Sequence, residues 1–259
     1  MARIFITGSA SGLGFGAARA LLSDGHDVVL HARRPESAGA LLEAFGELAA
    51  RAAGVVVGDL SSAAETRSVA EQVNSIGRMD AVIHNAGTYL EPTRGTTPEG
   101  HARTLAVNTL APYLLTALID RPDRLIYLSS GLHRSGSSSL EDLDWAERRW
   151  NAGQAYAESK LYVTAFALAA ARRWPSVLSN AVDPGWVPTR MGGPGAPDDL
   201  EMGHLTQTWL AASDDPSALT SGGYWHHRKL HPPAPDAFDS VFQERLLGEL
   251  AELTRIPLF

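Results

Sequence analysis

Short apolar runs alternate with longer amphipathic runs along most of the chain. The apolar runs predict strands at 3–7, 27–31, 54–58, 80–84, 124–129, 177–182 and 222–226. The amphipathic runs predict helices at 12–23, 36–51, 62–76, 98–119, 151–173, 200–212 and 236–254. Because strands that alternate with helices form a parallel sheet covered on both faces, we expect a doubly wound α/β fold with seven strands.

The stretch 185–216 breaks this alternation. It is rich in Gly, Pro and Asp, and it leaves room for only one short helix near 200–212. Because it follows the sixth predicted strand, we interpret 186–216 as a substrate-loop region. A chain of 259 residues with 44% hydrophobic content suffices for one core, so we expect a single domain over 1–259.

The composition excludes several classes of function. Lys and Arg number 22 against 29 Asp and Glu, and the net charge of −7 disfavours a nucleic-acid binder. The absence of Cys excludes disulfides and thiolate chemistry. The first residues do not resemble a signal peptide, and the longest apolar stretch, near 161–171, is too short for a membrane span. We therefore expect a cytoplasmic protein with no membrane span.

Three histidines near the C-terminal end, His226, His227 and His231, raise the question of a metal site. Adjacent residues of a strand point to opposite faces, and no acidic cluster completes a ligand shell. We therefore expect no metal. Among the aromatic residues that could line a substrate pocket, Trp186 is the best placed, because it follows the sixth predicted strand.

A glycine-rich loop joins the first predicted strand to the first predicted helix. The run Thr7-Gly8-Ser9-Ala10-Ser11-Gly12-Leu13-Gly14 contains three glycines, which permit a tight turn and a close approach of backbone to phosphate. The helix N-terminus then offers free N–H groups to a pyrophosphate. An ordinary glycine turn is the alternative. The cofactor-binding candidates in this loop are Gly8, Ser11, Gly12, Leu13 and Gly14.

The second predicted strand ends in Arg33-Arg34, where an enzyme that uses NAD commonly has an acidic residue. Arginine can pair with a 2′-phosphate, so we expect NADP(H) to be preferred, with NAD(H) possible. Two solvated loop arginines are the alternative. Asp59, after the third strand, is a candidate acceptor for the adenine amino group or a helix cap, and Leu60 beside it is a further cofactor candidate.

The candidate chemistry lies after the next strands. Asn85-Ala86-Gly87 follows the fourth strand, and Ser130 ends the fifth. Tyr156 and Lys160 are four residues apart, on one face of a predicted helix. A neighbouring ammonium favours the phenolate and lowers the pKa of a tyrosine, and a serine hydroxyl can donate to an oxygen that gains negative charge.

Together these motifs resemble the short-chain dehydrogenase/reductase family over nearly the whole chain, including the segment Pro184-Gly185-Trp186-Val187-Pro188-Thr189. The resemblance implies a Rossmann fold in which Tyr156 is the acid/base and Ser130 orients the substrate oxygen. It implies that Lys160 lowers the pKa of Tyr156 and holds the nicotinamide ribose, and that Asn108 kinks the long helix and holds a water in a proton relay. It also gives further cofactor contacts, namely Asn85, Ala86, Gly87, Tyr156, Lys160, Pro184, Gly185, Val187 and Thr189.

Within the family the chain looks most like the retinol-dehydrogenase-like branch. Three features carry this resemblance, namely Thr97-Pro98-Glu99-Gly100, the acidic stretch 140–145 and the segment 184–189. The resemblance implies an NADP(H)-dependent oxidoreductase that transfers a hydride between the nicotinamide and a small carbonyl compound or secondary alcohol. It also implies a homodimer or homotetramer that pairs through 98–119 and 151–173. Two alternatives remain: a cofactor-binding epimerase or dehydratase, and a non-enzymatic NADP(H) sensor.

Overall fold

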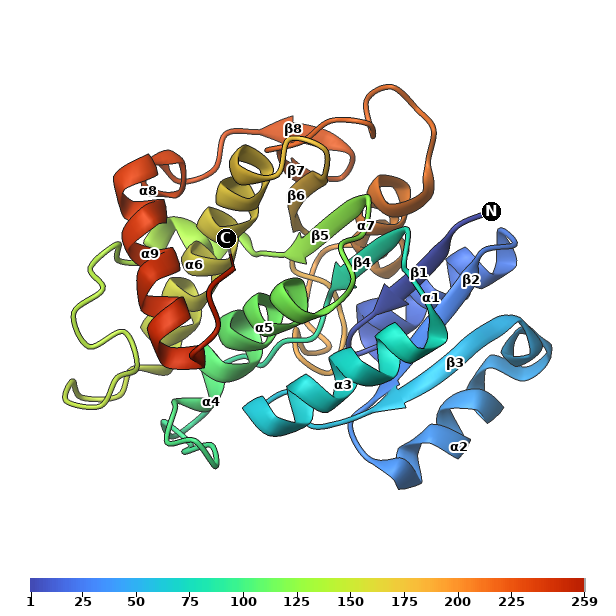
Figure 1. Ribbon diagram of the computed structural model, residues 1–259, viewed down its shortest axis with the longest axis horizontal. Helices are drawn as coiled ribbons and strands as arrows, with labels where there is room; N and C mark the ends of the chain where they lie inside the picture. The colour runs from blue at the N-terminus through green and yellow to red at the C-terminus, as the bar shows by residue number, and fades with distance from the viewer. Residues whose placement is uncertain (259) are drawn as a thin grey trace.

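A sheet of eight strands runs through the residues that the computed structural model describes, 1–258 (Figure 1). The strand order is β3-β2-β1-β4-β5-β6-β7-β8. In chain order the strands are β1 (Arg3–Ile6), β2 (Asp27–Ala32), β3 (Ala52–Val57), β4 (Ala81–His84), β5 (Arg124–Leu128), β6 (Leu178–Asp183), β7 (Tyr224–His226) and β8 (Lys229–His231). The predicted doubly wound sheet is confirmed. The predicted count of seven strands is corrected to eight, because a short antiparallel strand, β8, pairs with β7.

Helices cover both faces of the sheet. One face carries α1 (Gly12–Ser23), α2 (Pro35–Phe45) and α7 (Leu200–Ala212). The other carries α3 (Ala63–Ile76), α4 (Arg103–Leu105), α5 (Ala111–Leu118), α6 (Ala152–Arg173), α8 (Pro235–Phe238) and α9 (Ser240–Thr254). Two 3₁₀ turns, η1 (Gly46–Arg51) and η3 (Gly131–Ser135), and a π-helical turn, η2 (Ala106–Leu110), complete the elements.

The apolar strands supply a core on each face, as a parallel sheet requires. In β1, Phe5 belongs to the core under α3, α5 and α6, whereas Ile4 and Ile6 belong to the core under α1, α2 and α7. Tyr127 of β5 packs on the first of these cores, edge to face against Phe166 of α6. All of these side chains are fully buried, so the central strands are held from both sides.

The predicted helix over 98–119 is shorter and irregular. It begins at Arg103, because residues 95–102 form a turn closed by a bridge between Thr96 and Ala102. It then passes through the π-helical turn η2, which contains Asn108, before α5. Pro112 contributes to this irregularity, because it offers no N–H to the carbonyl of Asn108 four residues earlier. The helix is therefore irregular at Asn108, although it continues from α4 through η2 to α5.

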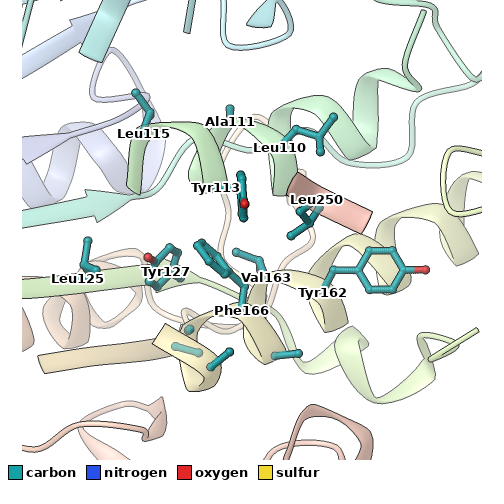
Figure 2. Close-up of a cluster of buried hydrophobic side chains, with 14 of the residues drawn as sticks. Leu110, Ala111, Tyr113, Leu115, Leu125, Tyr127, Tyr162, Val163, Phe166 and Leu250 are labelled. Carbon is teal, nitrogen blue, oxygen red and sulfur yellow. The ribbon is translucent and has the colours of Figure 1, made fainter. Parts of the chain in front are cut away.

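The C-terminal residues cover the outer surface of α5 and α6 (Figure 1). Leu250 of α9 lies beside Tyr113, Val163 and Phe166 in this part of the core (Figure 2). The Tyr113 hydroxyl donates to the backbone carbonyl of Ile256 at 2.8 Å. A second copy could reach these buried side chains only if α9 moved, so pairing through 98–119 and 151–173 would require a rearrangement of α9. The homodimer or homotetramer itself stays a prediction.

Two local predictions need correction at this end of the chain. The helix expected over 236–254 is divided, because Asp239 ends α8 and caps α9 by accepting from Val241 N at 2.8 Å. The rings of His226 and His227 do not point to opposite faces but stack at 3.8 Å, because His227 lies in the β7–β8 turn with a φ of 47°. In residues 1–258, no helix is long and apolar enough to cross a membrane.

Candidate active site

The candidate site lies at the carboxyl ends of the parallel strands. The strand order reverses between β1 and β4, and ligands of such sheets bind outside the carboxyl ends at this switch point. The loops that follow β1, β2, β3, β4, β5 and β6 therefore converge there. These are the loops that carry the candidate residues.

The glycine loop has a shape that only glycine permits. Gly8 and Gly12 have φ values of 66° and 56°, in the left-handed region. Gly14 is helical, yet a Cβ there would lie 2.4 Å from both the Gly8 carbonyl oxygen and the Asn85 Nδ2. Leu13 packs against α7, where a Cβ on Gly203 would lie 2.7 Å from the Leu13 Cδ2.

The N-terminus of α1 can accept an anion. Its N-cap residue, Ser11, makes no side-chain hydrogen bond to the helix, and no acidic residue occupies the first turn. The first N–H groups of a helix have no partner within it, so those of α1 are left to bind a ligand. Ser11 and Gly12 are exposed, as a phosphate-binding position requires. These features fit the pyrophosphate of a dinucleotide.

The segment after β4 braces this loop. Backbone N–H groups of Asn85 and Ala86 donate to the Thr7 Oγ1 at 2.9 and 3.0 Å. The Asn85 side-chain amide donates to the Thr7 carbonyl at 3.0 Å. A Cβ on Gly8 would lie 3.0 Å from the Ala86 Cα, so the two loops touch. Asn85 thus shapes the candidate cofactor site through its contacts with the glycine loop.

The two arginines after β2 are exposed. Neither Arg33 nor Arg34 forms an ion pair with another residue of the described chain, 1–258. Arg34 is the N-cap residue of α2, without a side-chain cap. Both guanidinium groups are therefore available for an anionic ligand.

Asp59 and Leu60 follow β3 at the same edge of the sheet. The Asp59 Oδ1 accepts from Ser61 N at 2.9 Å, which makes a local turn. Asp59 is not the cap of the next helix, because Ser62 holds that position and accepts from Glu65 N. The expectation of a capping role for Asp59 is therefore wrong. Leu60 is buried in the core and can offer a ligand little side-chain surface.

Tyr156, Lys160 and Ser130 come together beside Gly87. The Lys160 side chain is 5% exposed, and its Nζ donates to the Leu128 carbonyl at 2.7 Å and lies 5.7 Å from the centre of the Tyr156 ring. The Ser130 Oγ accepts from Leu132 N at 3.3 Å, and the Ser130 side chain lies close enough to Tyr156 to act on the pKa of its phenol. A Cβ on Gly87 would lie 3.6 Å from the Lys160 Nζ, so Gly87 lies directly against the ammonium.

The neighbouring Ser129 has a different environment. It is 3% exposed, and its Oγ hydrogen-bonds with the Thr164 Oγ1 at 2.6 Å inside the core. The Thr164 hydroxyl donates to the Lys160 carbonyl at 2.7 Å. Ser129 therefore supports α6 from behind, whereas Ser130 faces Tyr156.

Burial decides the protonation of this group. It raises the pKa of Tyr156 to about 12, which the nearby Ser130 side chain opposes only in part. Burial also lowers the pKa of Lys160 to about 8, which the Asp183 carboxylate opposes. Loss of hydration dominates, so the net pKa of Tyr156 lies above its usual value, and the lowering that we expect from the Lys160 ammonium stays a prediction. The phenol is neutral at pH 7 and carries a proton.

Asn108 joins the segment after β4 to the catalytic helix. Its Oδ1 accepts from Thr88 N at 2.8 Å, and its Nδ2 donates to the Thr88 carbonyl and to the Ser159 Oγ, both at 3.0 Å. A Cβ on Gly87 would lie 3.4 Å from the Asn108 Oδ1. The side-chain amide thus has its hydrogen-bond partners within the protein, and one of them, Ser159, is the residue before Lys160.

The segment after β6 closes the site from the α7 side. Thr189 lies against the glycine loop, where a Cβ on Gly12 would be 3.3 Å from its Cγ2. Val187 is buried and packs against Gly203 of α7, close to the Pro184 carbonyl. Gly185 has a φ of 83°, and its N–H donates to the Asp183 Oδ1 at 3.0 Å. All these candidates therefore lie at one edge of the glycine loop.

The loop beyond Thr189 is better anchored than its composition predicts. Trp186 is 59% exposed, but its Nε1 donates to the Gly192 carbonyl at 2.9 Å. Asp198 N donates back to the Trp186 carbonyl at 3.0 Å, and Asp199 caps α7. The Met191 Cε lies 3.9 Å from the position that a Cβ on Gly87 would occupy. The loop therefore extends over the catalytic group.

Sequence reasoning missed three side chains at this site. The Tyr89 ring meets the Tyr156 ring edge to face, with 4.6 Å between centroids. Asp183 accepts from the Tyr224 hydroxyl at 3.0 Å and acts on the pKa values of both Tyr156 and Lys160. His31 contacts the glycine loop. Asp183 and His31 lie at strand carboxyl ends, so the rule that located Ser130 could also have located them. In residues 1–258, no cluster of His, Asp and Glu that could hold a metal is found.

Comparisons with known proteins agree with this geometry. A family model described as enoyl-(acyl carrier protein) reductase matches residues 8–213. The short-chain dehydrogenase chyC of Penicillium rubens is 40% identical over 261 residues, which cover 100% of this chain and 99% of that protein. The protein named "Putative daunorubicin C-13 ketoreductase DnrU", from a Streptomyces species, is 36% identical, over 94% of this chain and 89% of its own length.

Similarity extends to an animal enzyme and to a solved fold. Retinol dehydrogenase 13 of Homo sapiens is 30% identical, over 96% of this chain and 83% of its own length. A crystal structure of a protein from Mycobacterium Paratuberculosis superposes with a TM-score of 0.84 at 26% identity, and the match covers 100% of this chain and 95% of that one.

Proposed function

This chain belongs to the short-chain dehydrogenase/reductase family, and we propose that it is an NADP(H)-dependent reductase of small-molecule carbonyl compounds. Membership of this family shows that the chain is an oxidoreductase. The similarity to retinol dehydrogenase 13 agrees with the resemblance to the retinol-dehydrogenase-like branch. The preferred cofactor, the kind of substrate and the roles of individual residues are the proposal.

One observation carries the proposal. A buried, neutral Tyr156 lies close to Ser130, which acts on its pKa, and beside Lys160 and Gly87. A carbonyl oxygen placed between the two hydroxyls would accept a hydrogen bond from Ser130 and a proton from Tyr156. As negative charge develops on that oxygen, both donors stabilise it, and a water-poor site strengthens the effect.

The neutral state of the phenol favours reduction. Reduction of a carbonyl ends with a proton on the new hydroxyl, and Tyr156 holds that proton at pH 7 because burial raises its pKa to about 12. Oxidation of an alcohol would instead need the phenolate, which is scarce at that pH. The Lys160 ammonium, 5.7 Å from the ring, would stabilise the phenolate left after the transfer.

The residues at the other end fit a dinucleotide. The free N-terminus of α1 and the glycine loop would hold the pyrophosphate, while Gly87, Lys160 and Thr189 would border the nicotinamide ribose and ring. When bound, the cofactor supplies the hydride. The exposed, unpaired guanidinium groups of Arg33 and Arg34 support NADP(H) over NAD(H), because each can pair with a 2′-phosphate.

Reprotonation of Tyr156 requires a path to solvent. The Asn108 side chain is committed to Thr88 and Ser159, so a relay water would have to be held by its backbone carbonyl. Pro112 supports this role, because it offers that carbonyl no N–H. We assign Asn108 to the relay on this basis, between Lys160 and the solvent.

The alternatives have less support. A nucleotide-sugar epimerase or dehydratase needs room for a large substrate domain, but the residues after Thr189 complete the sheet as β7 and β8 and cover α6 as α8 and α9. A sensor has no need of a buried Tyr156 close to both Ser130 and Lys160. The name of DnrU, a ketoreductase, supports a carbonyl substrate for this chain.

The test is NADPH consumption at 340 nm with a panel of ketones and aldehydes, in the wild type and two matched variants. Ser130→Ala removes the donor to the developing oxyanion and should lower kcat about 10²-fold. Ser129→Ala removes a hydroxyl from the adjacent, buried residue and should leave kcat nearly unchanged. Equal effects of the two changes would contradict the role of Ser130, and no carbonyl-dependent consumption at all would refute the proposed function.

A further inference from the structure

A buried histidine links three of the segments that border the proposed cofactor site. His31, the fifth residue of β2, is 4% exposed. Its Nδ1 lies 2.9 Å from Gly8 N, and its Nε2 lies 2.9 Å from the Gly58 carbonyl oxygen. Its backbone N–H donates to the Ser9 Oγ at 2.7 Å. The ring therefore joins the glycine loop to the ends of β2 and β3, two residues before Arg33 and one residue before Asp59.

The two ring contacts determine the protonation state. A backbone N–H can only donate, so the Nδ1 facing Gly8 has to be a bare acceptor. A backbone carbonyl can only accept, so the Nε2 facing Gly58 has to carry the hydrogen. Both bonds are satisfied only by the neutral ring with its proton on Nε2.

The charged ring cannot keep this arrangement. In the imidazolium both nitrogens carry hydrogen, and the Nδ1–H would then point at the Gly8 N–H across 2.9 Å. Either the ring or the turn at Gly8 has to move. Gly8 has a φ of 66° and its loop touches Ala86, so a shift of the turn alters the path that leads to the N-terminus of α1.

The surroundings keep the ring neutral near pH 7. Burial lowers the pKa of His31, and the Gly58 carbonyl and the Asp59 carboxylate oppose this less strongly. The glycine loop, 7–16, contains no charged side chain. Glu65 of α3 binds Asp59 N, and Arg33 and Arg34 extend into solvent beyond β2.

We propose that His31 is a positioning residue for the glycine loop, and that its protonation weakens dinucleotide binding. The inference rests on the proposed cofactor site and adds a pH-dependence to it. Cofactor affinity should be level near neutral pH, where the ring is neutral. It should fall as the pH drops below the usual range of histidine, by up to about tenfold per pH unit once the ring is charged in the free protein.

The test is the dissociation constant of NADP⁺, measured by calorimetry between about pH 4 and about pH 8, a range that extends well below ordinary histidine titration because burial lowers the pKa of His31. His31→Asn keeps an acceptor for the Gly8 N–H but cannot become charged, so its affinity at neutral pH should stay near that of the wild type. The steep loss of affinity at low pH should disappear in this variant. His31→Leu removes the acceptor and should weaken binding at every pH.

Two controls isolate the ring. The 2′-phosphate of the ligand has a second pKa of about 6, but it titrates identically with both proteins, so the difference between the wild type and His31→Asn reports His31 alone. Thermal melting at each pH verifies that the proteins remain folded. If His31→Leu does not fold, the comparison of the wild type with His31→Asn still tests whether protonation of His31 weakens binding.

Parallel pH profiles for the wild type and His31→Asn would overturn the inference while leaving the cofactor site intact. Failure of the wild type to bind NADP⁺ or NAD⁺ at any pH would remove the proposed function and this inference together. A flat profile in His31→Asn beside a falling one in the wild type would support the role of His31.

Discussion

The glycine loop and the catalytic group lie at the same edge of the sheet, but they depend on different properties of their residues. The loop has no charged side chain between residues 7 and 16, and its function depends on backbone conformation at Gly8, Gly12 and Gly14. The catalytic group depends on buried polar side chains, with Lys160 5% and Tyr156 7% exposed. Cofactor binding should therefore be sensitive to shape, and turnover to the loss of a single oxygen or proton.

The sharpest test of the shape of the loop is one added methyl group. In Gly14→Ala the Cβ would lie 2.4 Å from the Gly8 carbonyl oxygen, so the loop has to move away from α1. Loss of two backbone hydrogen bonds to the pyrophosphate, each about 1.5–3 kcal/mol, should raise the NADPH dissociation constant about 100-fold or more.

Gly39 of α2 offers the matched control, because a Cβ there meets nothing within 4 Å. Gly39→Ala should leave NADPH affinity unchanged and raise the free energy of unfolding by about 0.4–1 kcal/mol. Fluorescence titration of both variants measures the difference. Equal affinities for Gly14→Ala and Gly39→Ala would show that the close packing of the loop is irrelevant to binding.

A smaller effect is expected at the exposed end of β2. Arg33→Ala removes a guanidinium that no residue of 1–258 pairs with, so the fold should lose little. Loss of a charged hydrogen bond to the 2′-phosphate should weaken NADPH binding about 10-fold to 100-fold and leave NADH binding unchanged. The dissociation constants of NADPH and NADH, measured side by side for the wild type and Arg33→Ala, test this prediction. Equal weakening for both would mean that Arg33 does not read the 2′-phosphate.

The smallest effect should come from the loop between Thr189 and Asp199. It is held by hydrogen bonds at Trp186 and Asp198, yet Met191 reaches across to Gly87 and the loop has few buried side chains. Amide exchange should slow a few-fold when NADP⁺ and a substrate analogue are both bound, because closure over the site protects the backbone. Hydrogen exchange read by mass spectrometry measures this, and an unchanged rate in the ternary complex would leave the loop without a lid role.

How far the sequence predicted each region follows from the range of its contacts. The strands, the glycine loop and the Tyr156–Lys160 spacing are local patterns, and the structure has them where they were expected. The order of loops after parallel strands then brings Ser130 to Tyr156. Local periodicity was enough because these elements are held by the central sheet, whose residues are buried on both faces.

The parts that were missed depend on contacts far apart in the chain. The cover that α9 places over α5 requires Leu250 to meet Tyr113, which no local pattern indicates. The raised pKa of Tyr156 follows from its burial, and a spacing of four residues from Lys160 does not reveal burial. His31 looks like an ordinary strand residue until Gly8 and Gly58 are brought to its ring.

The Tyr156 hydroxyl is proposed to serve the chemistry, and Tyr156→Phe separates proton transfer from cofactor binding in one measurement. The change removes only the hydroxyl, so NADPH affinity should stay nearly unchanged while kcat for carbonyl reduction falls by about 10²–10⁴-fold. Tyr89→Phe, on the ring that packs against Tyr156, serves as the control and should retain most of the activity. Near-normal turnover by Tyr156→Phe, with NADPH binding intact, would contradict the central claim.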